Sequence, residues 1–354
     1  MNTYLLIGSL VAEEPLATCS RDLKDAYEAE NGPNKPTPVP VMQTAMGNRL
    51  YFPATGIRGA LRRCSRDVIR QHVIAATGNA KPWSLDQHYL MTLGGLQSEE
   101  SDRASVADVE KWRQANVHIS LFGGGGVGYL NFVQGHLNVG NAICEDACEP
   151  TIFSGARVDD FSRDGRQIAY LSDGDIQSLI QRSHSVKART DMAKQLKIAQ
   201  KAWRDAKASG GDVDAAKAEM AALEDQIAAS KKAGSVSVKM ARAGYQAIPQ
   251  GARMAQRCRL LQSNPVELGC LLAALSEFAM QPHLGAHGGT GCGLVSGEWE
   301  VFEVLSTGKQ SLGMIKLTPY EPLELGSPAL LEARSAFDSY LSSGKWDFSV
   351  PQSS

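Results

Sequence analysis

The sequence predicts an α+β protein whose sheet and helices are separated by large insertions. Residues 3–11 (TYLLIGSLV) form a short apolar run that predicts a buried strand. Residues 264–280 predict an apolar helix, and residues 297–305 (GEWEVFEVL) predict a second strand. Residues 188–233 have a helical pattern of different composition, rich in Ala, Lys, Asp and Glu. Strands and helices combined in this way predict a sheet with helices packed on it, plus decorations.

Composition sets the first limits on function. The chain has 354 residues, of which 43% are hydrophobic and 21% are charged, so it can bury a sizeable core. Its formal net charge of −2 argues against a protein that binds nucleic acid over its whole surface. The seven cysteines are scattered and include no Cys-x-x-Cys pair, which indicates reduced thiols of a cytoplasmic protein. We therefore expect no cofactor, no metal site, no signal peptide and no membrane-spanning segment.

Basic residues are nevertheless concentrated in three islands. Residues 58–70 hold five arginines against one aspartate, and residues 182–204 hold seven basic residues against one aspartate. Residues 231–259 hold seven basic residues and no acid. The acidic residues collect in 86–110, 145–164 and 212–225. Such a chain can carry a basic groove and an acidic surface on different faces, so it could bind a polyanion, and its copies could stack head to tail.

The first third of the chain predicts a loop followed by a helix. Residues 13–50 are polar, and their four prolines from residue 33 to residue 40 exclude a regular helix or central strand around them. This segment predicts a long functional or mobile loop. Residues 51–76 predict a helix capped by Thr55. Its buried stripe is expected at Ile57, Leu61, Cys64 and Val68.

Further elements follow in the middle and C-terminal parts. Residues 78–115 are polar and predict an insertion, and residues 117–142 predict a strand, a glycine loop and a second strand. Residues 246–262 alternate well enough to predict another strand. Asn264 and Glu267 form a capping box that, with a proline at the first helical position, predicts the start of a core helix. Its apolar positions are Leu268, Leu271, Leu272, Leu275 and Phe278.

The insertion at 188–233 predicts a helical hairpin that turns at Gly210 and Gly211. Its apolar residues recur every three or four positions, as in a coiled-coil seam. They are Leu196, Ala199, Trp203 and Ala206 in the first helix and Ala216, Met220, Leu223 and Ile227 in the second. The hairpin is either a solubilising decoration or a contact for partners or RNA.

The stretch 284–301 (LGAHGGTGCGLVSGEWEV) is unusually rich in glycine, which lets backbone approach a partner closely. A dinucleotide-binding loop has a strand before its glycines and a helix after them, whereas here a helix precedes and a strand follows. No Gly-Lys-Ser/Thr phosphate loop occurs either. His283 and His287 lie in a loop, which favours structural histidines over a metal site or a general base. Either histidine could still contact a phosphate or a 2′-hydroxyl.

The helix at 51–76 carries the stronger signal for a ligand. Its arginines form a stripe opposite the apolar one and comprise Arg58, Arg62, Arg63, Arg66 and Arg70. Only Asp67 is a local partner, so most of these charges are expected to be unpaired. Gly56 and Gly59 lie at the same end as Arg58, where bare N–H groups can receive phosphates. Because aromatic residues are only 6% of the chain, we expect backbone-directed, sequence-tolerant binding of single-stranded RNA.

Four segments together resemble the RAMP superfamily of CRISPR proteins. Residues 51–63 (YFPATGIRGALRR) resemble its arginine-containing helix start, and residues 119–132 (ISLFGGGGVGYLNF) resemble its internal phenylalanine–glycine segment. Residues 264–280 (NPVELGCLLAALSEFAM) match the helix that precedes its C-terminal glycine loop, which residues 283–295 (HLGAHGGTGCGLV) resemble. The segments occur in the superfamily's order, and the chain is most similar to the type IV form of the backbone subunit.

This resemblance implies a single RRM-like (ferredoxin-like) domain over residues 1–354 with insertions. A thumb-like loop would lie at 13–50, and further insertions at 78–115 and 180–245. The resemblance also implies a non-catalytic subunit that polymerises along guide RNA (crRNA) in a helical filament. Its partners would be further copies of itself, other CRISPR effector subunits and a target nucleic acid that pairs with the guide.

The RNA-binding residues expected from the motifs and the resemblance lie on four segments. They are Thr55, Gly56, Arg58, Arg62, Arg63, Arg66, Gly124, Gly125, Arg189, His287, Gly288, Gly289, Thr290 and Gly291.

Two alternatives to this expectation remain open. Some relatives cut target RNA with an aspartate in the thumb-side loop, which makes Asp22 and Asp25 the candidate catalytic residues. The surrounding sequence (CSRDLKDAYEAE) departs from that of the cutting subunits. A guide-processing endoribonuclease that uses His283 or His287 is the second form of this enzyme alternative. The other alternative is a scaffold or small-molecule-binding protein without an RNA role.

Overall fold

The computed structural model describes residues 2–19, 21–31, 35–95, 106–127, 130–158, 171–209, 213–232 and 239–350. The chain divides into two compact units. The larger contains residues 1–153 and 244–354, and the smaller contains residues 154–243. The larger unit combines an antiparallel sheet with helices, so the α+β class is confirmed.

The larger unit is built on a nine-stranded sheet with the order β13-β12-β11-β1-β10-β7-β3-β2, in which β6 also pairs with β10. The neighbouring strands of this sheet all pair antiparallel. The strands are β1 (Asn2–Ala12), β2 (Val41–Thr44), β3 (Gly47–Phe52), β6 (Leu137–Val139), β7 (Ala142–Cys144), β10 (Arg253–Ser263), β11 (Val295–Leu305), β12 (Gly308–Leu317) and β13 (Glu324–Leu325). The strands predicted at 3–11 and 297–305 are therefore confirmed as β1 and β11.

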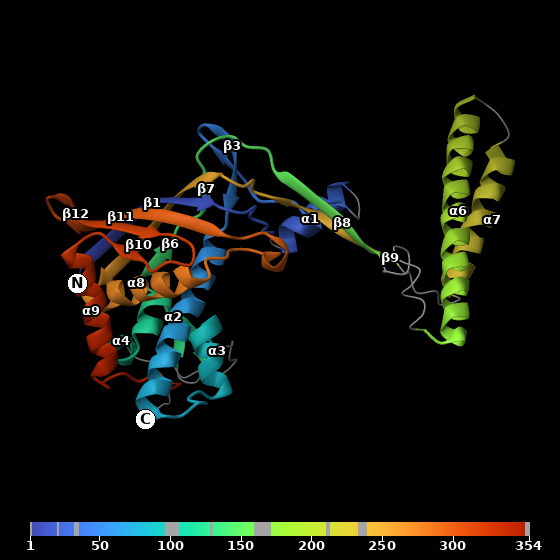
Figure 1. Ribbon diagram of the computed structural model, residues 1–354. Coiled ribbons are helices and arrows are strands. Elements are labelled where there is room, and N and C mark those ends of the chain that lie inside the picture. The colour runs from blue at the N-terminus through green and yellow to red at the C-terminus, as the bar shows by residue number, and fades with distance from the viewer. Residues whose placement is uncertain are drawn as a thin grey trace. The chain divides into compact units, whose positions relative to one another are not determined.

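Helices cover one face of this sheet (Figure 1). They include α2 (Ala54–Thr77), α8 (Pro265–Met280) and α9 (Pro328–Ser342). Strand β10 shows which side is buried, because Met254, Cys258 and Leu260 are covered whereas Arg257 and Arg259 are exposed. The predicted strand at 246–262 is therefore correct in its second part. Its first residues belong instead to β9 (Lys239–Ala247) and a turn.

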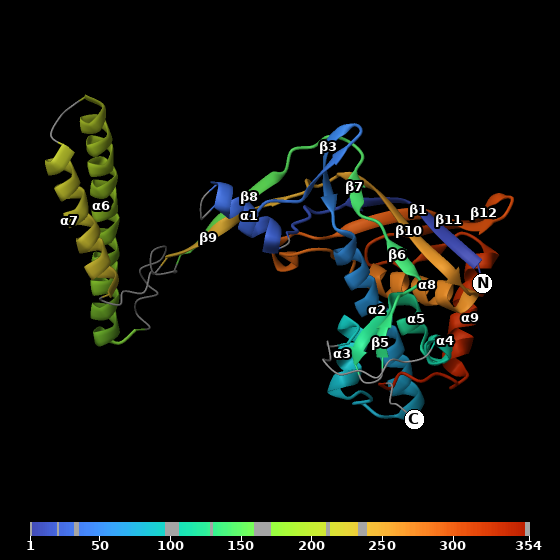
Figure 2. The same cartoon turned by 180° about the vertical axis from the view of Figure 1, so that it is seen from behind.

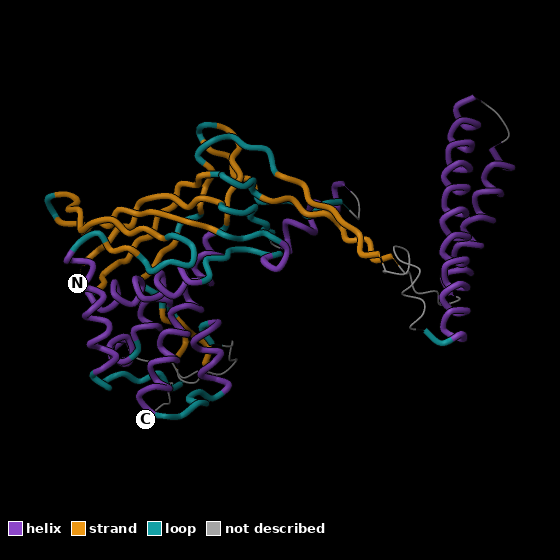
Figure 3. Tube along the Cα trace, in the orientation of Figure 1, coloured by secondary structure: helices purple, strands orange, loops and turns teal. Residues whose placement is uncertain are grey.

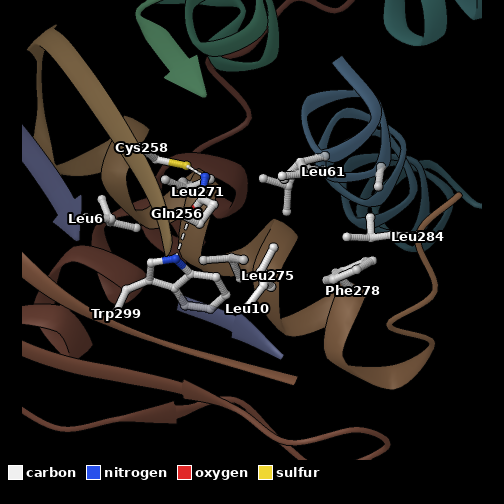
Figure 4. A pocket seen from close by; sticks show the side chains of 12 residues that line it. Leu6, Leu10, Leu61, Gln256, Cys258, Leu271, Leu275, Phe278, Leu284 and Trp299 are labelled. Atoms are coloured by element: carbon white, nitrogen blue, oxygen red, sulfur yellow. Dashed lines mark hydrogen bonds between the residues drawn. The ribbon is translucent and has the colours of Figure 1, made fainter. Parts of the chain in front are cut away.

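Apolar side chains from the sheet, α2 and α8 meet in the core around a small cavity (Figure 4). Its volume is about 20 Å³, close to the smallest space that holds one water molecule. The indole Nε1 of Trp299 donates a hydrogen bond of 2.7 Å to Oε1 of Gln256 at its edge. The cavity is a packing defect of the core rather than a ligand site, because it is both apolar and too small for a substrate.

Helix α8 begins as its sequence predicts. The side chain of Asn264 accepts from the Glu267 N–H at 3.0 Å, and Oε2 of Glu267 accepts from the Asn264 N–H at 3.0 Å. Oε1 of the buried Glu267 also accepts from the Ser120 hydroxyl at 2.6 Å and lies 2.8 Å from Nδ1 of His136. The capping box therefore also ties α8 to two other segments.

The segment at 13–50 is more regular than predicted. It contains α1 (Arg21–Asn31), β2 and β3, whereas residues 35–40 form only an isolated bridge between Thr37 and Tyr245. Helix α1 buries no residue, so no apolar period announces it. Ion pairs one turn apart, such as Arg21–Asp25 at 3.7 Å, follow its exposed surface.

The segment at 117–122 corrects a second prediction. It forms the short helix α5 (Val117–Phe122) instead of a strand, and each of its six residues is buried. A run of six apolar residues is too short to show the periodic pattern that distinguishes a buried strand from a buried helix. The Asn116 side chain caps the start of the helix by accepting a hydrogen bond from the Ile119 N–H. The glycine-rich strand β4 (Gly124–Val127) follows it and pairs with β5 (Leu130–Val133) as an antiparallel hairpin.

The polar segment at 78–115 contains two described helices. These are α3 (Leu85–Leu93) and α4 (Val106–Ala115). Both lie with α2 and the β4–β5 hairpin on the helical side of the sheet (Figure 2).

The smaller unit contains α6 (Asp173–Ser209) and α7 (Val213–Lys232), which pack against each other (Figure 3). The two strands β8 (Thr151–Val158) and β9 form a separate two-stranded sheet. The seam residues of the helices are more covered than their exposed neighbours. The described ones are Leu196, Ala199, Trp203, Met220, Leu223 and Ile227. None of the helices in the described ranges is long and apolar enough to cross a membrane.

Candidate nucleic-acid interface

The first half of α2 forms one wall of a groove of about 910 Å³. The other walls come from residues 92–95 at the end of α3 and the turn after it, residues 122–125 at the end of α5 and the start of β4, and residues from 133 to 139. Among the described residues that line the groove there is no aspartate or glutamate. The groove is therefore lined by arginine, polar groups, glycine and apolar side chains, without a like-charged barrier to an anion.

Two segments predicted separately meet in this groove. Thr55, Arg58 and Arg63 come from α2, and Gly124 and Gly125 come from the glycine strand more than 60 positions later. The structure also explains one of the glycines. A methyl group at Gly124 would lie 3.3 Å from the Gly94 carbonyl oxygen, so the strand packs tightly on the turn after α3.

Arg62 lies in the floor of the groove and has a structural role there. It is only 6% exposed. Its guanidinium donates to the carbonyl oxygens of Leu90, Met91, Phe122 and Gly123 at 2.9 to 3.3 Å. Burial, and next the charge of Arg58, lower the pKa of Arg62 to about 10, so it remains protonated at neutral pH. The carbonyls lie at the C-terminal ends of α3 and α5, where helix dipoles favour a cation.

Arg58 and Arg63 lie differently on the same helix. Arg58 is half-buried and donates to the Phe122 carbonyl oxygen, and burial lowers its pKa. Arg63 is exposed and lines the groove. A methyl group on Gly59 would lie 3.6 Å from a terminal guanidinium nitrogen of Arg63, so the arginine extends along its own helix. Arg63 is thus well placed to meet an anion in the groove.

Arg66 and Arg70 lie outside the groove and share one partner. Both make ion pairs with Asp67, at 2.9 and 3.1 Å respectively, and Arg66 also donates to the Thr92 hydroxyl at 3.0 Å. The prediction that most arginines of this helix are unpaired is therefore wrong. Counting nearby acids in the sequence missed the backbone carbonyls that other segments supply.

The start of α2 also differs from its prediction. Pro53 is the N-cap residue and Thr55 makes no cap. The Ala54 N–H donates to Oδ1 of Asn141 at 2.8 Å, and the Gly56 N–H donates to the Pro53 carbonyl at 3.0 Å. These N–H groups are therefore already used and are not bare phosphate ligands.

The glycine loop around residues 283–293 does not line the groove, but it packs on the same ring as the start of α2. A methyl group would lie 2.7 Å from the Phe52 ring if placed on Gly56, and 3.2 Å from it if placed on Gly285. Phe52 is buried and joins the two segments. The exposed tip of the loop consists of His287, Gly288, Gly289, Thr290 and Gly291.

The remaining predicted site residues lie elsewhere. Arg189 lies in α6, in the smaller unit, and its side chain is outside the described residues. Asp22 and Asp25 lie in α1, and the Asp25 carboxylate is 3.7 Å from Arg21. Among the described residues, no group of three His, Cys, Asp or Glu side chains could hold a metal ion.

Groove residues that sequence reasoning missed come mainly from the turn after α3 and the segment after β5. Gly94 and Gly95 are both in left-handed conformations, and Gln134 and Asn138 add polar groups to the opposite wall. The adjacent glycines in a polar segment were the available signal for the turn.

A buried polar chain supports the groove from below. Nε2 of His118 lies 2.7 Å from the Met91 carbonyl oxygen, and Nδ1 lies 2.9 Å from the Ser65 hydroxyl. Because a carbonyl can only accept, Nε2 carries the proton and Nδ1 accepts from Ser65. Burial first, and then the Arg62 charge, lower the pKa of His118 well below its ordinary value.

Comparison with solved structures finds similar chains at low sequence identity. One is described as "Type IV-B CRISPR Complex", with 12% identity, coverage of 88% of this chain and 93% of that chain, and a TM-score of 0.41. Another is "Crystal structure of Csm3-Csm4 subcomplex in the type III-A CRISPR-Cas interference complex", with 8% identity, 96% coverage of both chains and a TM-score of 0.34. A third is "Crystal structure of Thermofilum pendens Csc2", with 10% identity, coverage of 97% of this chain and 74% of that chain, and a TM-score of 0.34.

No protein-family model and no curated protein matches the chain.

Proposed function

We propose that this chain is a non-catalytic backbone subunit that polymerises along a guide RNA in a type IV-like CRISPR ribonucleoprotein and presents the guide for target pairing. The observation that carries the RNA-binding part is the groove beside α2. It combines Arg58 and Arg63 with glycine backbone at Gly124 and Gly125, and none of its described lining residues is acidic. Cations beside glycines, which have no side chain to keep a ligand away, favour a phosphate chain and carry little base-specific information.

We also propose that the sheet has an RRM-like core. The strands β11, β1, β10 and β6 follow one another in this order and are antiparallel. Helix α8 follows β10 and leads back to β11, and α2 lies between β1 and β6 in the chain. This arrangement is the split βαβ pattern of ferredoxin-like domains.

The non-catalytic part is a separate proposal from RNA binding. Asp22 and Asp25 lie on α1, which buries none of its residues. If the chain cut RNA through these carboxylates, cleavage by the purified chain would require a divalent cation and would be lost in Asp22→Ala and Asp25→Ala. We expect labelled single-stranded RNA to remain intact with the natural chain, with and without magnesium.

Titration of fluorescein-labelled single-stranded RNAs with the full chain tests RNA binding. Fluorescence anisotropy at several salt concentrations should show binding that weakens with salt, and oligonucleotides of different sequence should bind similarly. No binding at low salt would contradict the proposal, and so would binding that depends strongly on sequence and weakly on salt.

A further inference from the structure

Three aromatic rings stack between the strands β8 and β9 and the glycine loop. The rings of Phe153 in β8 and Tyr245 in β9 have centroids 5.2 Å apart and planes 17° apart. The imidazole of His287 stacks on Tyr245 at 3.9 Å with planes only 8° apart. His287 is exposed whereas Phe153 and Tyr245 are half-buried, so the stack ends at the surface on an imidazole.

The backbone of His287 is held in an uncommon conformation. Its φ of 66° and ψ of 22° place it in the left-handed region. For a residue other than glycine this conformation costs about 1–2 kcal/mol, and residues strained in this way are often found where a protein contacts a ligand. The stack on Tyr245 and the backbone hydrogen bond from the Ala286 N–H to the Ala17 carbonyl oxygen fix the loop beside it.

Gly288 and Gly289, which follow His287, border open space that packing within the chain does not fill. A methyl group on Gly289 would meet no heavy atom within 4 Å, and one on Gly288 would meet only the His283 ring, at 3.8 Å. Neither glycine has the positive φ that excludes other residues. By contrast, Gly285 is required internally, because a methyl group there would lie 2.3 Å from the Ala17 carbonyl oxygen.

We propose that the exposed ring of His287 is a stacking platform for an unpaired nucleobase, with Gly288 and Gly289 giving the adjoining ribose and phosphate close access to the loop. A flat ring at the end of an ordered stack offers a nucleobase a π-face without a choice of sequence. This inference rests on the proposed RNA-binding function and adds base contact to a site that would otherwise recognise only the RNA backbone.

The position of the loop supports one continuous path for the RNA. The glycine loop and the first turn of α2 pack on the same Phe52 ring. The proposed path of the RNA therefore runs along the groove beside α2 and past this junction to the exposed ring of His287.

The test separates base contact from backbone contact with two oligonucleotides of equal length. One is an ordinary single-stranded RNA and the other carries abasic sites in place of its bases. Affinities are measured for the full chain and for two variants. His287→Asn keeps a residue that tolerates the left-handed backbone but removes the ring, whereas His287→Phe keeps a ring and removes the imidazole nitrogens. Thermal unfolding of each variant shows whether the fold is retained.

His287→Asn should bind ordinary RNA about 5- to 100-fold more weakly than the natural chain does, because one stacked base loses its platform. The same variant should bind the abasic oligonucleotide as the natural chain does, and His287→Phe should bind ordinary RNA nearly as well as the natural chain. Equal affinity of His287→Asn and the natural chain for ordinary RNA would overturn the stacking platform and leave the proposed function intact. An equal loss for both oligonucleotides would also overturn it, because it would show a backbone contact. Absence of binding by the natural chain to either oligonucleotide would overturn the proposed function itself.

Discussion

Arg62 donates a hydrogen bond of 2.9 Å to the carbonyl oxygen of Gly123 and so fixes the glycine segment to the arginine helix. The same guanidinium reaches the end of α3 through Leu90 and Met91. One buried cation therefore holds two walls of the groove, while its neighbour Arg63 is exposed inside the groove. Adjacent arginines are thus expected to have separable roles, Arg62 in stability and Arg63 in the proposed RNA binding.

Replacing Arg62 is expected to damage the fold. Arg62→Met fills similar space but removes a charged donor that is hydrogen-bonded to four carbonyl oxygens. The carbonyls of Leu90, Met91 and Phe122 keep a second donor, so the cost is the loss of these charge-assisted hydrogen bonds, about 3 kcal/mol in total. Urea unfolding followed by circular dichroism measures this change. The matched control is Arg63→Ala, which should shift the free energy of unfolding by less than about 0.5 kcal/mol because Arg63 is exposed. Equal stability of Arg62→Met and the natural chain would contradict the structural role.

Replacing Arg63 is expected to weaken RNA binding without affecting the fold. Arg63→Ala removes an exposed cation from the groove, so affinity for single-stranded RNA should fall roughly 10-fold at low salt. The slope of log affinity against log salt should become shallower by about 0.7 for one lost phosphate contact. Arg70→Ala is the control, because Arg70 lies on the same helix, outside the groove and paired with Asp67. Equal losses in the two variants would indicate a general charge effect rather than binding in this groove.

The glycine loop should separate glycines needed for RNA from glycines needed for folding. Gly289→Ala meets no heavy atom within 4 Å, so its stability should change by less than about 0.5 kcal/mol while its RNA affinity falls about 3- to 10-fold. Gly293→Ala should instead lower stability by about 1–3 kcal/mol. Gly293 has a φ of 107°, and a methyl group there would lie 2.8 Å from the Leu284 carbonyl oxygen. Differential scanning fluorimetry measures the stability of each variant, and the anisotropy titration measures its RNA affinity. If Gly289→Ala bound RNA as tightly as the natural chain does, close approach of RNA at the loop tip would be refuted.

The buried His118 should make the fold sensitive to acid. Its pKa is well below the ordinary value in the folded chain, chiefly because of burial, and returns to about 6.5 on unfolding. Below pH 6.5 the unfolded chain therefore binds a proton that the folded chain does not. As the pH is lowered below 6.5, this group should accordingly reduce the free energy of unfolding by up to about 1.4 kcal/mol per pH unit. The reduction disappears when the pH is raised above 6.5.

His118→Gln keeps hydrogen-bonding capacity but cannot titrate, so it isolates that contribution. Between pH 6.5 and 5, its stability should fall less steeply with acid than that of the natural chain, whatever its stability at neutral pH. Parallel pH profiles for the two proteins would show that His118 is charged in the folded state as well.

The elements that could be predicted from sequence are those with one buried side or with a clear capping signal. The alternation of β10 and the capping box of α8 both reappear in the structure, and so does the seam of α6 with α7. Helix α1 was missed because it buries none of its residues, and α5 because all of its residues are buried. Neither a fully exposed helix nor a fully buried one leaves a periodic pattern of apolar residues in the sequence.

The candidate site was only partly predictable, for a different reason. The positions of the arginines on α2 and of the glycines at 124 and 125 follow from sequence. Which arginine is free depends on carbonyl groups at Leu90, Phe122 and Gly123, which tertiary packing brings to Arg62. Backbone carbonyls are identical in every residue, so no sequence pattern marks the ones that an arginine will reach.

Native mass spectrometry of the full chain, mixed with single-stranded RNAs of increasing length, tests the central claim most directly. A subunit that polymerises along RNA should give a ladder of complexes in which the number of bound copies rises with RNA length. Arg63→Ala should shift this ladder toward fewer copies at the same concentration. Failure of the natural chain to bind RNA, or a single bound copy at every RNA length, would contradict the account.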